Sequence, residues 1–423
     1  MTNVLNILKA TELERLDVQL DKWLATHTGD LVELRRHLHA HPELSGTEVA
    51  TARLLADRLT AAGRRPALLP KGNGVICDVG PAQVDPDGAG PEQAGRAGAL
   101  RTVALRADID ALPVQDLKDV PYRSIVDGVC HACGHDVHAT VVAGTGLFLA
   151  SLGDALPGRV RLLFQPAEEI LPCGSLEVIE AGGLAGVSEI YAIHCDPKLP
   201  AGRIGLRTGP LTAAADNLTI TLRGPGGHPA RPHRSVDLMD ALGRVVTELP
   251  AVLSRRSDTR GGLLVVFGEF QAGADPGTIP TEGRVAGTVR VLDRDTWGQA
   301  ADLVTGVVRD LVAPTGAVVD VDYQRGRPPV VNDARAVRTL TGATVSALGP
   351  DAIAEVPQSM GGEDFSWYLE QVPGAMARLG TAIDGYDLDL HQGSFDVDER
   401  AIGVGVRLLV HTVVRALLGS DRT

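Results

Sequence analysis

The fold class is indicated by residues 101–113, which read RTVALRADIDALP. A short apolar run ends here in aspartates and a proline, as a buried strand does where it leaves a sheet. Two later stretches repeat this form: GRVRLLFQPAEE at residues 158–169 and VSEIYAIHCDP at residues 187–197. Helical stretches separate the three segments. This alternation predicts an α/β domain with a mostly parallel central sheet flanked by helices.

The polar ends of these segments carry candidate chemistry. In parallel sheets, functional sites form at the carboxyl ends of the strands. The first segment ends with Asp108 and Asp110, the second with Glu168 and Glu169, and the third with His194. We therefore expect these side chains to face one crevice.

The pattern changes near residue 214. Residues 214–326 have the order β-α-β-β-α-β, which is that of a ferredoxin-like α+β sandwich. We expect this segment to form an inserted domain, and residues 1–213 and 327–423 to form the first domain together. Residues 81–100 are rich in Pro, Gly and Ala, which favours a surface insertion.

Bulk properties restrict the class of protein. A chain of 423 residues is long enough for two domains. A net charge of −13 argues against a nucleic-acid partner, because phosphate binding needs a basic face. No segment is interpreted as a membrane span or a signal peptide, so we expect a cytoplasmic protein. Five cysteines, an odd number, favour reduced thiols that bind metal or take part in catalysis.

The densest cluster of potential ligands is CHACGHDVH at residues 130–138. Cys133 and His135 flank Gly134, and a turn entering a helix would let both side chains face one centre. A thiolate with an imidazole suits zinc and similar metals. The chain has no second Cys-x-x-Cys motif, so further ligands must come from distant parts of the sequence. The candidates are Glu169, His194 and His391. Considered singly, Glu169 could be a solvated carboxylate, His194 a packing histidine and His391 a surface histidine.

Seven motifs occur in order between about residues 30 and 415: LRRHLHAHPELSGTE, LRADIDALP, HACGHDVH, FQPAEE, IHCDP, GPGGHPARPH and GGEDFSWYLEQVPG. Together they resemble the hippurate hydrolase and auxin-conjugate amidohydrolase branch of the aminoacylase–carboxypeptidase metallohydrolases. The resemblance implies a metallopeptidase-type catalytic domain with two divalent metal ions that share a cysteinate. The ions would be Zn²⁺ or Mn²⁺, with Co²⁺ or Ni²⁺ as alternatives.

The resemblance also implies roles for individual residues. The implied metal ligands are Cys133, His135, Glu169, His194 and His391. Glu168 is the implied general acid/base, acting on a hydroxide held by the metals. Asp136 and His138 are expected to orient the ligands, whereas Cys130 and His131 are expected to pack.

The inserted segment resembles the lid of this family, through which subunits pair into a homodimer, with a tetramer as the alternative. His228 resembles a lid histidine that reaches the partner's active site and holds the oxyanion. Arg290 matches an arginine that binds the substrate carboxylate. Gly277 stands where family members carry an asparagine that helps to bind substrate, so the carboxylate end of the substrate is less defined.

The resulting hypothesis is a metal-dependent amidohydrolase that cleaves N-acyl amino acids or related small amides. A dipeptidase or carboxypeptidase on the same scaffold is the nearest alternative. A non-catalytic metal-binding homologue is a further one, although all five ligand positions and Glu168 are present.

Overall fold

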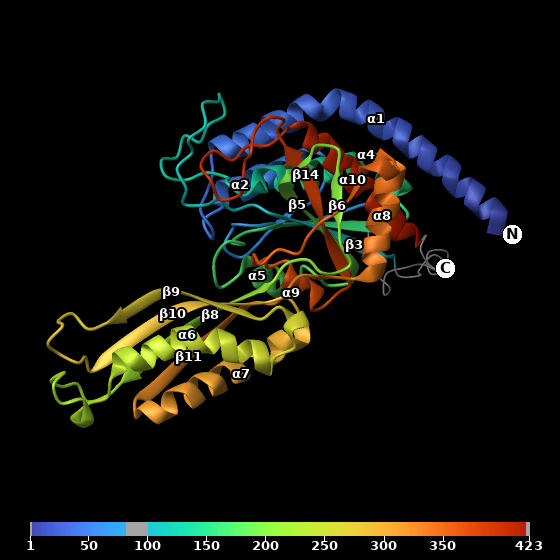
Figure 1. Ribbon diagram of the computed structural model, residues 1–423. Coiled ribbons are helices and arrows are strands. Elements are labelled where there is room, and N and C mark those ends of the chain that lie inside the picture. Colours follow the sequence, from blue (N-terminus) through green and yellow to red (C-terminus); the bar gives the residue numbers. More distant parts are fainter. Residues whose placement is uncertain (1, 82–99, 420–423) are drawn as a thin grey trace. The chain divides into compact units, whose positions relative to one another are not determined.

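The computed structural model describes residues 2–81 and 100–419. Residues 82–99, which hold most of the predicted insertion, lie outside the described residues. The chain forms two compact units (Figure 1). Unit 1 comprises Met1–Thr208, Asn332–Val356 and Trp367–Thr423, and unit 2 comprises Gly209–Val331 and Pro357–Ser366. The sequence-based boundaries lay at 213 and 326 and placed residues 357–366 in the first domain, whereas the structure groups that short segment with unit 2.

The sheet of unit 1 has eight strands in the order β1-β2-β4-β3-β5-β14-β6-β13. Its centre consists of the parallel strands β4 (Arg159–Gln165), β3 (Thr102–Asp108), β5 (Val187–Pro200) and β14 (Gly374–Ala382). On one side, β2 (Val75–Val79) and β1 (Ala67–Leu68) join in antiparallel fashion. On the other side, β6 (Ile204–Leu206) is antiparallel to β14, and β13 (Ile353–Glu355) is parallel to β6. The predicted mostly parallel sheet is therefore confirmed for its centre.

Helices cover this sheet. Their bounds are α1 (Thr2–Ala40), α2 (Val49–Ala61), α4 (His135–Leu152), α5 (Gly174–Glu180), α8 (Ala334–Leu348), α9 (Ser366–Leu369) and α10 (Arg400–Leu418). Helices α4 and α10 pack on the strands, and α1 packs on both of these helices. Small residues allow α4 to approach closely, since a Cβ at Gly146 would lie 2.3 Å from Leu162 Cδ1.

Helix α10 is long and apolar enough to cross a membrane, which the sequence interpretation did not anticipate. However, 72% of its most apolar window is buried inside the protein, as in the core helix of a soluble protein. Within unit 1, its buried residues include Ile402, Leu409 and Val413.

Unit 2 contains β8 (Ala214–Arg223), α6 (Leu238–Arg256), β9 (Leu264–Ala272), β10 (Glu282–Val291), α7 (Arg294–Val312) and β11 (Val318–Arg327). Its four strands are antiparallel in the order β11-β8-β10-β9, which is the ferredoxin-like order that the sequence predicts. Alternate residues of β8, among them Leu218, Ile220 and Leu222, are fully buried. Helices α6 and α7 begin at aspartate caps, Asp237 and Asp293, that accept backbone N–H bonds.

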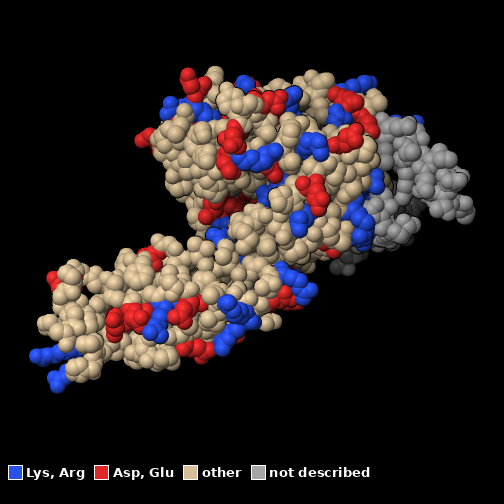
Figure 2. All heavy atoms as spheres, viewed as in Figure 1, with Lys and Arg blue, Asp and Glu red and all other residues tan. Residues whose placement is uncertain are grey.

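Shorter elements complete the chain. The strands β7 (Gly209–Pro210) and β12 (Val331–Asn332) form a two-stranded ladder. Single 3₁₀ turns occupy Gly153–Ala155, Pro232–Arg234, Thr259–Gly261, Ala313–Thr315 and Pro350–Ala352. On the face drawn in Figure 2, acidic and basic side chains are interspersed over the surface.

Candidate metal centre

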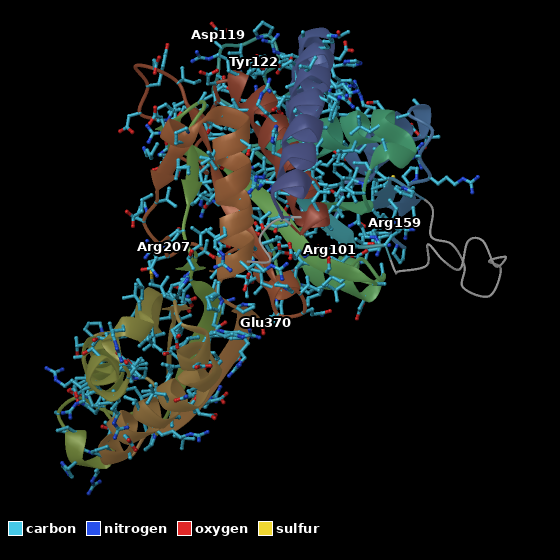
Figure 3. The ribbon with its side chains drawn as sticks, turned by 90° about the vertical axis from the view of Figure 1, so that its right-hand side faces the viewer. Arg101, Asp119, Tyr122, Arg159, Arg207 and Glu370 are labelled. Carbon is cyan, nitrogen blue, oxygen red and sulfur yellow. The ribbon has the colours of Figure 1, made fainter. Side chains whose placement is uncertain are left out.

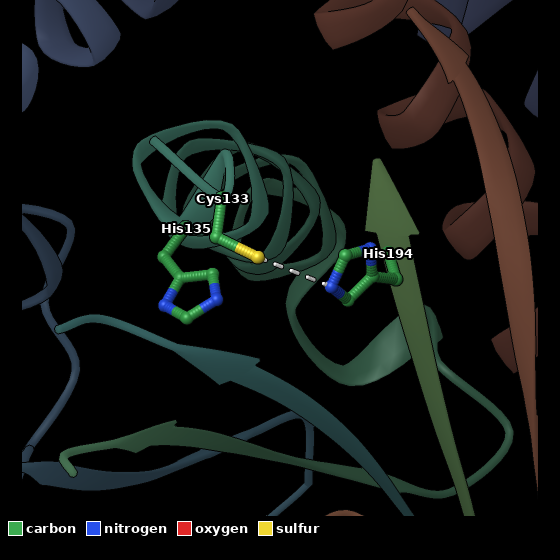
Figure 4. Close-up of side chains that lie close together, drawn as sticks. All are labelled: Cys133, His135 and His194. Carbon is green, nitrogen blue, oxygen red and sulfur yellow. Dashed lines mark hydrogen bonds between the residues drawn. The ribbon is translucent and has the colours of Figure 1, made fainter. Parts of the chain in front are cut away.

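The turn before α4 brings the first two candidate ligands together. Gly134 caps α4 with a φ of 85°, a left-handed conformation that favours glycine. A Cβ at this position would lie 2.8 Å from Cys195 Sγ, so a larger residue would displace Cys195. Cys133 precedes this turn and His135 begins the helix, and their side chains lie side by side (Figure 4). The predicted turn into a helix is confirmed.

His194 approaches from β5. The sequence placed it at a strand end, but β5 runs on to Pro200, so His194 lies within the strand. β3 pairs with β5 only as far as Ala192, two residues before His194. Its Nδ1 donates to Cys195 O at 2.8 Å, which leaves the lone pair of Nε2 3.6 Å from Cys133 Sγ (Figure 4). Burial, together with the charge of Arg378, lowers the pKa of His194 well below its usual value, so the ring is neutral, as a metal ligand must be.

Glu168 and Glu169 lie beyond the end of β4, which ends at Gln165. They follow Ala167, whose φ of 51° turns the chain. Glu48 Oε1 accepts the Ala167 N–H at 2.7 Å and holds this turn. As a result both carboxylates offer an oxygen within 4.8 Å of a ring nitrogen of His135.

His391 comes from the loop before α10. Its φ of 61° makes it, with Ala167, one of two non-glycine residues in the described chain with a positive φ. Such strain persists only where the surroundings enforce it. Its N–H donates to Ala132 O at 2.7 Å, which joins this loop to the Cys133 turn. Its Nε2 lies 3.3 Å from Glu169 Oε1.

Cys133 is the residue around which these groups gather. Cys133, His135 and His194 offer ligand atoms that all lie within 4.8 Å of one another, and so do Cys133, Glu169 and His391. The two sets share only the cysteine. The structure therefore brings together all five ligands that the resemblance implied, with Glu168 beside His135 and Glu169 in a third such group.

The donor atoms fit divalent metal ions. His135 Nε2 and Glu169 Oε1 are buried, and neither has a hydrogen-bond partner among the described residues. Buried polar atoms normally have a bonding partner, and a bound metal ion would provide one for both of these atoms. Burial raises the pKa of the Cys133 thiol, and a bound cation is what favours the thiolate in such a place. Thiolate, imidazole and carboxylate together suit Zn²⁺ or Mn²⁺.

Asp110 and His138 make hydrogen bonds with His135 and with Cys195, the neighbour of His194. His138 accepts the Cys195 N–H at Nε2 (2.8 Å), so its Nδ1–H donates to Asp108 Oδ1 (2.6 Å). His135 donates from Nδ1 to Asp110 O at 2.9 Å, which directs Nε2 to the metal side. The sequence placed Asp108 and Asp110 at the crevice without assigning them this role.

Asp136 makes contacts that the sequence did not reveal. Its Oδ2 lies 2.7 Å from His39 Nδ1 and 2.8 Å from Arg35 Nε, and all three side chains are completely buried. Both α1 residues belong to the motif LRRHLHAHPE, but no spacing rule connects that motif with Asp136. Cys130 is buried, and its backbone bonds with Leu112.

The remaining predicted residues lie in unit 2. His228 is exposed after β8, and its Nδ1 accepts the Ala230 N–H at 3.1 Å. Gly277 lies in an exposed turn, where its N–H donates to Asp275 Oδ1 at 2.7 Å. Arg290 is half-buried on β10.

Comparison with known proteins identifies relatives over most of the chain. The family model described as Peptidase family M20/M25/M40 matches residues 104–415. A probable hydrolase of Synechocystis is 41% identical over 379 residues, covering 89% of this chain and 93% of the relative. An N-acetylcysteine deacetylase of Bacillus subtilis is 35% identical over 394 residues, covering 93% of this chain and 98% of the relative.

Two further likenesses extend this finding. The structure of a dinuclear metal-binding peptidase of the M20 family from Bacillus subtilis has a TM-score of 0.80 at 32% identity, covering 93% of this chain and 99% of that one. A longer Rhodococcus jostii protein, provisionally named glutamate–cysteine ligase 2-3, is 46% identical over 381 residues, covering 90% of this chain. The present chain spans only 46% of that protein's length, so the ligase name does not identify the activity of the matching part.

Proposed function

Because the chain belongs to peptidase family M20/M25/M40 and is a metal-dependent amidohydrolase, we propose that its substrates are N-acyl amino acids. The observation that carries this proposal is the position of Cys133 in two separate groups of ligand atoms. A relative covered along 98% of its length is named for the deacetylation of N-acetylcysteine, which makes that compound the first to test.

The proposed cofactor is a pair of divalent ions, Zn²⁺ or Mn²⁺, with Co²⁺ or Ni²⁺ as alternatives. Cys133 would serve both ions. The other ligands would be His135, Glu169, His194 and His391. The two groups that share Cys133, and the buried atoms of His135 and Glu169 that have no hydrogen-bond partner among the described residues, support this assignment.

Glu168 is proposed as the general acid/base. The metals, when bound, polarise the amide carbonyl and make a water molecule acidic. Glu168 is 4% exposed, so a proton that it takes from the attacking water is not readily lost to solvent. It then transfers this proton to the leaving amine. The hydrogen bonds of Asp110 and Asp108 hold His135 and His138 in place meanwhile.

Unit 2 is proposed to act as lid and dimerisation domain. Its edge strand β9 exposes three large apolar side chains, Leu264, Val266 and Phe270. An open, apolar strand edge favours pairing with another chain, which supports a homodimer. In that dimer His228 would stabilise the oxyanion in the partner's site, and Arg290 and Gly277 would adjoin the substrate carboxylate. The protein as a whole is proposed to be cytoplasmic.

The deciding experiment is a panel of amides offered to protein reloaded with Zn²⁺, Mn²⁺ or Co²⁺. N-acetyl and N-benzoyl amino acids should be hydrolysed faster than free dipeptides. The reverse order would establish a dipeptidase or carboxypeptidase, an alternative supported by a 31% identical relative named as a carboxypeptidase. Failure on every amide with both metals bound would establish a non-catalytic homologue.

A further inference from the structure

A charged pair lies inside the central strand β3, next to the candidate metal centre. Arg106 and Asp108 are two positions apart, so their side chains project from the same face of the strand. Both side chains are completely buried, which is rare for charged residues unless they are paired. Arg106 Nη1 donates to Asp108 Oδ2 at 2.7 Å, and Arg106 Nε donates to Gln165 Oε1 at 2.8 Å. The guanidinium is therefore bonded to the last residues of two adjacent strands, β3 and β4.

Asp108 has the position of a metal ligand. Its Oδ2 lies 3.6 Å from His135 Nε2, the buried ring nitrogen without a hydrogen-bond partner among the described residues. Two ligands that each lie about 2.1 Å from a tetrahedral ion are about 3.4 Å apart. Asp108, His135 and His138 also offer ligand atoms that all lie within 4.8 Å of one another. By distance alone, the carboxylate of Asp108 could bind an ion that His135 holds.

Both oxygens of this carboxylate are nevertheless engaged within the protein. Oδ2, the oxygen near His135, accepts the bond from Arg106, and Oδ1 accepts the His138 Nδ1–H at 2.6 Å. An ion bound at Oδ2 would have to displace the guanidinium, and the positive charge of Arg106 would then repel it. The pairing with Arg106 thus opposes coordination of a metal ion by Asp108.

We propose that Arg106 is a positioning residue that keeps Asp108 out of the metal coordination, so that the ions bind the two groups sharing Cys133. This inference rests on the proposed function and its metal pair. Buried charges in proteins are paired or coordinate metals, and here a fixed guanidinium takes the part that a metal ion would otherwise take for Asp108. Without Arg106, Asp108 would offer an oxygen to the ion at His135, which would then depend less on the thiolate of Cys133.

The test measures Zn²⁺ affinity in Cys133→Ala protein by competition with a chromophoric chelator. Cys133→Ala alone should bind Zn²⁺ weakly. Adding Arg106→Met should raise the affinity about 10- to 100-fold, the range over which residues around a metal centre change its affinity. Asp108→Asn as a third substitution should remove this gain, since an amide brings no charge to the ion. Equal affinities of Cys133→Ala with and without Arg106→Met would overturn the inference, as would a gain that survives Asp108→Asn.

Two control substitutions use the same Cys133→Ala background. Arg106→Lys retains a cation beside Asp108, so it should give no gain in affinity. Arg161→Met breaks another arginine–aspartate pair of this sheet, in which Arg161 Nε donates to Asp78 Oδ1 at 2.7 Å. Asp78 belongs to none of the ligand groups found among the described residues, so this change should also leave the affinity unchanged. A gain with either control would overturn the inference, because it would follow from loosening of the sheet alone.

The wild-type protein provides a measurement that does not depend on the folding of a variant. In a crystal structure of Zn²⁺-loaded protein, Asp108 should keep its bond to Arg106. An Asp108 oxygen at about 2.0–2.2 Å from either ion, the usual Zn–O distance, would overturn the inference and leave the proposed amidohydrolase activity intact. Neither test depends on turnover. A loaded enzyme that cleaves no amide would therefore refute the proposed activity and leave the role of Arg106 standing.

Discussion

Arg35 Nε lies 2.8 Å from Asp136 Oδ2, and both side chains are completely buried. Asp136 directly follows the candidate ligand His135. The same guanidinium places Nη2 3.0 Å from Oδ1 of Asp396, in the segment that follows His391. One α1 side chain therefore connects the two segments that supply most of the candidate ligands. Burial opposes ionisation of Asp136, but the charge of Arg35 prevails and holds the pKa of Asp136 well below its usual value.

Replacing this guanidinium should weaken metal binding. Arg35→Met keeps most of the side-chain volume but leaves two buried carboxylates without their cation. We expect metal affinity to fall about 10- to 100-fold, as for other residues that support ligands. The free energy of unfolding should fall by about 3–5 kcal/mol. Competition with a chromophoric chelator, below the melting temperature, measures the affinity of the folded protein.

Arg36→Met is the matched control. Arg36 is the adjacent residue and pairs with Glu399 and Glu33, but its side chain is 39% exposed. Its loss should leave metal affinity unchanged. If Arg35→Met also retained wild-type affinity while only its stability fell, Arg35 would be a structural residue alone. Tyr122 (Figure 3) also contacts this guanidinium, because the centroid of its ring lies 4.9 Å from Arg35 Cζ. Replacing Tyr122 would give a second variant in which metal affinity and stability can be compared.

Glu168→Gln should separate chemistry from metal binding. The amide cannot accept and return a proton, so turnover should fall by roughly 10²- to 10⁴-fold. Metal content and fold should remain, because Glu168 is not among the five proposed ligands. Steady-state rates together with metal analysis of the same sample provide the test. Near-normal turnover of a metal-loaded variant would remove Glu168 from the mechanism.

Cys133→Ala should empty both proposed metal positions. A ligand common to two groups affects both when it is lost, so metal content should fall sharply from about two ions per chain. Cys130→Ala is the control, since Cys130 is equally buried but belongs to neither group. Plasma emission spectroscopy of dialysed protein gives the count. Full occupancy in Cys133→Ala would exclude a shared cysteine ligand.

Glu48 should give metal-free protein a pH-dependent stability. Burial, with a contribution from Asp110, raises the pKa of Glu48 from 4.5 to about 7. Between these values the folded chain holds a proton that the unfolded chain has released. The contribution to the free energy of unfolding is therefore complete below pH 4.5 and is lost as the pH rises to about 7. The loss amounts to at most about 3 kcal/mol.

Glu48→Gln tests this expectation. The amide oxygen can still accept the N–H groups of Gly46 and Ala167, which lie 2.8 Å and 2.7 Å from Glu48 Oε1. The variant should therefore lose less stability than wild type between about pH 5 and pH 8 in urea titrations. Parallel pH profiles for the two proteins would show that Glu48 does not titrate in this range.

Phe270→Glu should disrupt the proposed dimer. Phe270 is 46% exposed on the edge strand β9, and a charge at a paired edge is unfavourable. Light scattering should show dimers for wild type and monomers for the variant. Val318→Glu, on the opposite edge strand β11, is the control and should remain dimeric. A Phe270→Glu dimer as tight as that of wild type would exclude β9 from the interface.

The sequence predicted the mostly parallel centre of the sheet, and it named candidate ligands that the structure places close together, because both depend on local patterns. Apolar runs that end in polar residues placed Glu168 and Glu169 near their final positions. Cys133 and His135 were identified as candidate ligands because they are two positions apart and flank a glycine. His391 was a candidate from its residue type, and the resemblance then implied its role as a metal ligand.

Other features escaped prediction because they depend on packing between distant segments. Arg35 and Asp136 are 101 positions apart, and no local pattern indicates that a charged helix residue will be buried against a turn. The convergence of Glu168 and Glu169 depends on the positive φ of Ala167, for which alanine gives no signal.

The place of β14 in the sheet has a consequence for biosynthesis. This strand lies between β5 and β6, yet it is translated after the entire 209–331 segment of unit 2. A nascent chain can therefore complete unit 2 on the ribosome while the strand that carries His194 still lacks a neighbour on one side. His391 and the apolar helix α10 emerge later still. Until then the unpaired edge of β5 and its apolar surface are exposed, and the proposed metal site cannot be complete before His391 has been translated.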